Sequence, residues 1–108
     1  MFTAVWEFAE NFNAKYGKLD VLVNNAGVLL DQREVTKDNL EVTFATNVLG
    51  PFVLTNGLLP SLRKSSDPRV LMMTSGGSYL ERLDVTDLQS QKGFNGKRVY
   101  SQVRFSTY

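Results

Sequence analysis

Tyr100 and Arg104 are the first candidates for acid–base chemistry. They lie four residues apart in a segment that is expected to be helical. At that spacing the two side chains lie on one face of a helix. A free phenol ionises at a pH of about 10, roughly three units too high for acid–base work at neutral pH. A fixed cation alongside is the direct way to close that gap. An exposed Tyr/Arg pair without function is the alternative, and the pair alone favours that alternative.

Asn47 is a polar residue on the apolar side of a long predicted helix. The expected buried face of that helix repeats at spacings of four and three and comprises Leu40, Phe44, Asn47, Pro51, Leu54 and Leu58. A buried Asn needs hydrogen-bond partners. Pro51 has no N–H, so the Asn47 carbonyl loses its usual helical donor. A free carbonyl beside a polar side chain suits a bound water, and a structural Asn in a proline-kinked helix is the alternative.

Two mostly apolar segments, residues 19–23 and 69–73, predict strands that are buried on both faces, as in a parallel sheet. Each ends in small polar residues, and ligands of open parallel sheets bind beyond the carboxyl ends of the strands. After the first strand, Asn25, Ala26 and Gly27 would let a cofactor approach the backbone closely. After the second, Ser75 would point its hydroxyl into the same crevice. For either motif alone a simple turn is the alternative; the pair on neighbouring strands favours a site.

Three helices must position these residues. An apolar stripe from Phe2 to Tyr16 predicts the first, ended by Gly17. The second is expected from Thr36, as N-cap, to about Lys64, and the last from near Arg98, after a turn at Asn95-Gly96. The order helix–strand–helix–strand–helix predicts an α/β fold, a partial Rossmann unit from a doubly wound parallel sheet. Sheets usually have about 4–6 strands, so two strands suggest a piece of a larger sheet.

Composition excludes several classes of function. The 108 residues contain no Cys and no His, which removes disulfides, Cys/His zinc sites and catalytic triads with a His base; no metal site is expected. A net charge of +1 does not favour nucleic acid or an anionic membrane as partner. No uninterrupted apolar run approaches the roughly 18 residues of a membrane span. The N-terminus lacks the basic region of a signal peptide, so a cytoplasmic protein is the default expectation.

Four motifs together resemble the short-chain dehydrogenase/reductase family: N-N-A-G at 24–27, T-N-V-L-G at 46–50, V-L-M-M-T-S at 70–75, and Tyr100. The resemblance implies an NAD(P)-dependent oxidoreductase that transfers hydride between the nicotinamide and a carbonyl or alcohol substrate. It implies that Tyr100 exchanges a proton with the substrate oxygen and that Ser75 hydrogen-bonds that oxygen. It also implies that Asn47 holds a relay water and that Asn25, Ala26 and Gly27 line the NAD or NADP site.

The sequence departs from the family pattern in two places. The glycine-rich phosphate loop T-G-x-x-x-G-x-G is absent, and Arg104 stands at the position of the catalytic Lys, a change that is not conservative. Residues 1–108 are therefore expected to be the central part of a single NAD(P)-binding domain, without its N-terminal glycine-rich βαβ unit and its C-terminal segment. Such a chain alone is expected to be inactive. The alternatives are an inactive fragment that acts through subunit association, as a homo-oligomer, and a nucleotide-binding module without catalysis.

Overall fold

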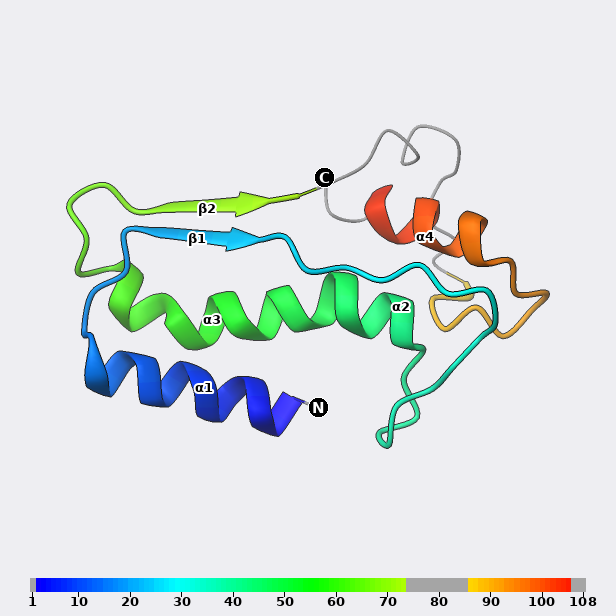
Figure 1. Ribbon diagram of the computed structural model, residues 1–108, viewed down its shortest axis with the longest axis horizontal. Coiled ribbons are helices and arrows are strands. Elements are labelled where there is room, and N and C mark those ends of the chain that lie inside the picture. The colour runs from blue at the N-terminus through cyan, green and yellow to red at the C-terminus, as the bar shows by residue number, and fades with distance from the viewer. Residues whose placement is uncertain (1, 74–85, 106–108) are drawn as a thin grey trace.

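The computed structural model describes residues 2–73 and 86–105, and its elements follow the order helix, strand, helix, strand, helix (Figure 1). The elements are α1 at Phe2–Lys15, β1 at Val21–Asn24, α2 at Val42–Phe44, a π-helical turn η1 at Ala45–Leu49, α3 at Gly50–Leu62, β2 at Arg69–Met72 and α4 at Gly96–Phe105. β1 and β2 pair in parallel, with Val23 opposite Leu71. The α/β class, the parallel pairing and the order of elements are thus confirmed.

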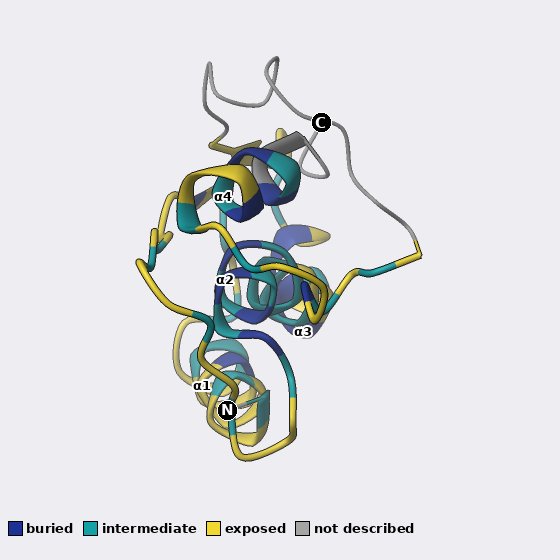
Figure 2. Ribbon diagram, turned by 90° about the vertical axis from the view of Figure 1, so that its right-hand side faces the viewer, coloured by how far each residue is buried: buried dark blue, intermediate teal, exposed yellow. Residues whose placement is uncertain are grey.

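α1 packs against α3 at a point where α3 has no side chain. Gly57 is buried, and a Cβ built on it would lie 2.7 Å from Ala9 Cβ and 3.4 Å from the Trp6 ring. Asn13 Nδ2 donates to the Gly57 carbonyl at 2.8 Å across the same contact. The buried residues gather along the helices that face each other (Figure 2). The core cluster consists of Ala9, Leu22, Leu58 and Leu62.

Among the described residues, the two-stranded sheet is covered only on the side of β1 that faces α3. Figure 1 shows the sheet lying on α3, and α3 lying on α1. Leu22 and Asn24 are buried, whereas Val21 and Val23 alternate with them and are 46% and 52% exposed. All of β2 is exposed as well. The prediction that both strands are buried on both faces is therefore wrong for this chain, because the layer that would bury the outer face is not among these residues.

We expect the isolated 108-residue chain to self-associate through this outer face. Val23 and Leu71 are register partners in a parallel pair and share one side of the sheet, where 52% and 47% of their surfaces are exposed. Open strand edges beside an apolar face pair readily with another chain. Light scattering should show a mass that rises with concentration, and Val23→Thr with Leu71→Thr should lower it, while Phe52→Thr on α3 serves as the control. A monodisperse wild-type monomer with a cooperative melt would contradict the expectation.

The long helix begins later than the sequence predicts. Thr36 is not its N-cap: the Thr36 hydroxyl accepts from the N–H groups of Asp38 and Leu40 and closes a local turn. The helix starts at Val42, and Glu41 is the N-cap, accepting from Thr43 N at 2.8 Å and Phe44 N at 2.7 Å. A carboxylate at a helix N-terminus also faces the positive end of the helix dipole. Glu41 itself is fully buried.

The last helix begins earlier than predicted. Asn95 and Gly96 do not form a free-standing turn, because Asn95 caps α4: its Oδ1 accepts from Arg98 N at 3.1 Å and its carbonyl from Val99 N at 2.8 Å. Gly96 is the first helical residue. An Asn-Gly pair is a turn signal in general, but Asn is equally a preferred N-cap.

The continuous helical stretch Val42–Leu62 has 21 residues and is long and apolar enough to cross a membrane by length and composition alone, with a mean hydropathy of 1.3 in an 18-residue window. Core helices of soluble proteins share that property. Threonine, asparagine and serine residues interrupt the stretch, which is why it contains no uninterrupted apolar run. In the fold it packs against α1, β1 and α4.

Candidate active site at the strand ends

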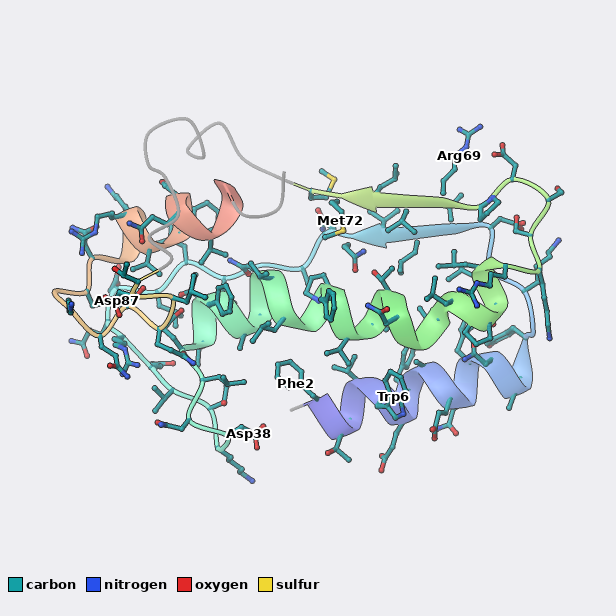
Figure 3. The ribbon with its side chains drawn as sticks, turned by 180° about the vertical axis from the view of Figure 1, so that it is seen from behind. Phe2, Trp6, Asp38, Arg69, Met72 and Asp87 are labelled. Atoms are coloured by element: carbon teal, nitrogen blue, oxygen red, sulfur yellow. The ribbon has the colours of Figure 1, made fainter. Side chains whose placement is uncertain are left out.

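Asn24, the last residue of β1, joins three elements at the carboxyl end of the sheet. It is 7% exposed, and its Nδ2 donates to Thr55 Oγ1 on α3 at 3.2 Å and to Met72 Sδ on β2 at 3.1 Å. Figure 3 shows Met72 at the end of its strand, beside the end of β1. Sequence reasoning assigned Asn24 no role of its own. The structure shows that it fixes both strand ends to the helix beneath them.

Asn25, Ala26 and Gly27 leave β1 as an exposed loop. Asn25 and Ala26 line a cavity of about 240 Å³ between the start of α1, the end of β1 and the π-helical turn. The loop thus presents backbone and small side chains at the carboxyl end of the strand, which is the position expected of residues that a cofactor approaches. Within residues 2–73 and 86–105, no group of three or more acidic side chains is placed to hold a metal.

Asn47 lies in the π-helical turn and is 1% exposed. Its side chain forms two reciprocal hydrogen bonds with one backbone unit: Val28 N donates to Oδ1 at 2.9 Å, and Nδ2 donates to Val28 O at 3.0 Å. The amide therefore holds the loop that follows Gly27. The Asn47 main-chain carbonyl, to which Pro51 has no N–H to donate, is a further acceptor for a bound water.

The helix is distorted at Asn47 in the way the proline predicts. In η1, the Gly50 N–H donates to the Ala45 carbonyl, five residues earlier, in place of the usual four. Pro51 has no N–H to offer the Asn47 carbonyl. Single π-helical turns of this kind occur frequently at functional sites. The sequence predicts a bend and a free carbonyl near Pro51, whereas the π-helical form of the turn is seen only in the structure.

Tyr100 is half-buried on α4, and α4 packs against α2 and the π-helical turn. The element that carries Tyr100 and the element that carries Asn47 are therefore neighbours. Arg104 follows one turn later within α4, but its side chain lies outside the described residues. Ser75 lies outside them as well. The structure thus places the elements that carry three of the four predicted motifs, at 24–27, 46–50 and 100, next to one another.

Gln89 is a residue that sequence reasoning missed. Its Oε1 accepts from Glu41 N at 2.6 Å, and its carbonyl accepts from Arg33 Nε at 2.9 Å. These bonds attach the segment before α4 to the segment between β1 and α2. No local pattern marks such a residue, because both partners lie about 50 positions away in the sequence.

Comparison with known proteins agrees with this arrangement. Residues 2–87 match the family described as short chain dehydrogenase. Human Dehydrogenase/reductase SDR family member 12 is 48% identical over 99 residues, which cover 91% of this chain and 31% of the relative. Polyprenol dehydrogenase of Danio rerio is 41% identical over 108 residues, covering 96% and 33%. A solved but uncharacterized protein from Mycobacterium paratuberculosis superposes with a TM-score of 0.81 at 29% identity, covering 99% of this chain and 37% of that one.

The parallel strands and their covering helices define a Rossmann-type α/β fold. The chain belongs to the short-chain dehydrogenase/reductase family, whose members are NAD(P)-dependent oxidoreductases. It spans about a third of the length of the curated relatives that it matches.

Proposed function

We propose that this chain is the catalytic middle section of an NAD(P)-dependent oxidoreductase that interconverts a carbonyl and an alcohol. One observation carries the proposal. Asn47 holds Val28, directly after the Asn25–Gly27 loop, and α4, the helix that carries Tyr100, packs against the same π-helical turn. The elements that carry three polar motifs far apart in the sequence are therefore neighbours, and ligands of this fold bind at the carboxyl end of its parallel sheet.

Each residue has a distinct role in the proposal. Asn25, Ala26 and Gly27 line the bound dinucleotide, which supplies the hydride chemistry. In the reductive direction the Tyr100 hydroxyl gives its proton to the substrate oxygen as the carbonyl becomes an alcohol, and Ser75 hydrogen-bonds that oxygen. A water on the Asn47 main-chain carbonyl belongs to the path that returns a proton to Tyr100. In the oxidative direction the same proton moves back from the alcohol to Tyr100.

The test uses a completed chain, in which these 108 residues replace the matched third of human Dehydrogenase/reductase SDR family member 12. We expect this completed chain to oxidise NADPH or NADH only when a carbonyl substrate is added, measured by absorbance across a panel of aldehydes and ketones. A folded completed chain that binds the cofactor but turns over no carbonyl or alcohol would overturn the proposal.

A second candidate is association without catalysis. It is favoured by the exposed apolar outer face of the sheet, where Val21, Val23 and Leu71 are each more than 40% exposed. Under this candidate the chain acts by binding another subunit through that face. The completed-chain assay separates the two, because association alone predicts no carbonyl-dependent oxidation.

Arg104→Lys is expected to raise turnover of the completed chain by at least about 10-fold, or about 1.4 kcal/mol of barrier. Arg104 follows Tyr100 by one turn of α4, where the family pattern has Lys. The guanidinium keeps the charge, but its planar bulk would displace the ribose or move the charge outward, and about 1 Å of misplacement can cost about 100-fold. Steady-state kinetics check this, with Arg63→Lys at the exposed end of α3 as control. An unchanged rate would mean that Arg104 is competent.

A further inference from the structure

The start of α4 touches the loop after β1 through a residue that has no side chain. A Cβ built on Gly96 would lie 1.8 Å from the Leu30 carbonyl oxygen and 2.9 Å from its carbon. Real Cβ atoms essentially never come within 3.0 Å of such atoms, so a side chain here would force helix and loop apart by about 1 Å. The neighbouring atoms are backbone and cannot swing away. A residue with a side chain therefore does not fit at position 96 without a shift of the backbone.

This contact lies one helical turn from Tyr100. Gly96 and Tyr100 are four residues apart in α4 and share one face of the helix. On the other side of the contact, Leu30 is two residues after Val28, whose backbone Asn47 holds with two hydrogen bonds. A short series of packed backbone contacts thus links Asn47, the loop after β1 and the turn of α4 that carries Tyr100.

Two further features hold α4 against the loop. Val99 and Val103 are 1% and 3% exposed and form the buried face of the helix, which packs against α2 and η1. Gln89 attaches the preceding segment through Glu41 N and Arg33 Nε. The helix is thereby held by its buried face and by the segment that leads into it. The Gly96 contact then sets how closely the first turn of α4 approaches the loop.

We propose that Gly96 is a positioning residue for proton transfer by Tyr100, acting with the Gln89 attachment to set the distance between Tyr100 and the loop where the cofactor would lie. The inference rests on the function proposed above and adds a residue that itself contacts neither substrate nor cofactor. Its effect should fall on the chemical step, because Tyr100 exchanges its proton in the transition state, while ground-state binding depends on other groups.

Gly96→Ala in the completed chain tests the proposal. The expected result is a 10- to 100-fold fall in kcat with KM for the carbonyl and Kd for NADPH within about twofold of the parent, from the cost of about 1 Å of misplacement. Lys97→Ala is the matched control, since Lys97 is the exposed next residue of the same helical turn, and it should leave kcat unchanged. A folded Gly96→Ala variant with the parental kcat overturns the proposal. A variant in which kcat falls and KM rises by similar factors also overturns it.

Gln89→Ala decides the matter if Gly96→Ala does not fold. It removes the side-chain bond to Glu41 N but keeps the Gly96 contact. The proposal then requires a smaller fall in kcat, of about 3- to 10-fold by the same misplacement argument, with KM retained; an unchanged kcat overturns it. Failure of the parent completed chain to turn over any carbonyl would instead refute the proposed function, so the two failures are distinguishable.

Discussion

Tyr100→Phe in the completed chain is expected to reduce turnover by at least about 100- to 10,000-fold, the range that a positioned acid or base contributes. The change removes one oxygen and keeps the ring, so the half-buried position on α4 stays filled. Carbonyl-dependent NADPH oxidation measures the loss.

Tyr16→Phe is the matched control for that experiment. Tyr16 follows α1, is 61% exposed, and stacks on Phe12 at a distance from the strand ends. It should leave turnover unchanged. If Tyr100→Phe is as active as its parent while NADPH binding is retained, the assignment of Tyr100 as the proton donor is wrong.

The isolated 108-residue chain is expected to bind NAD(P) at least about 100-fold more weakly than the completed chain. The sequence contains no glycine-rich phosphate loop, so the backbone N–H groups and helix N-terminus that would hold the pyrophosphate are not among its residues. Asn25, Ala26 and Gly27 contribute a lining but no positive charge. Calorimetry with NADH and NADPH measures both chains, and a dissociation constant in the low micromolar range for the isolated chain would contradict the expectation.

The types and order of the elements could be predicted because they depend on local periodicity. The apolar stripe of α1, the two apolar runs and the residues that end them all lie within short windows, and each element appeared within about two residues of its expected bounds, except the start of the long helix. There the sequence predicts Thr36, a common N-cap type, whereas the structure uses Glu41, whose N–H donates to Gln89 Oε1.

The candidate site was predictable as a set of residues and much less so as a geometry. Asn47 stood out as a polar residue on an apolar face, but its partner is the Val28 backbone, which carries no residue-specific signal. The sequence predicts Gly96 as part of a turn. Its contact with the Leu30 backbone leaves no signal in the local sequence, because Leu30 lies 66 positions earlier in the chain. Ser75 and the Arg104 side chain stay predictions, since both lie outside the described residues.

The contact between α1 and α3 also gives this chain an optical reporter. Trp6 is its single tryptophan, and the indole lies beside Gly57 with 47% of its surface exposed. Figure 3 shows Trp6 on α1, alongside α3. Its emission therefore depends on whether these two helices are together, and it is insensitive to tryptophans elsewhere because there are none. Separation of α1 from α3 would move the indole fully into water and shift its fluorescence to the red, so excitation selective for tryptophan over the four tyrosines reports on this single helix crossing.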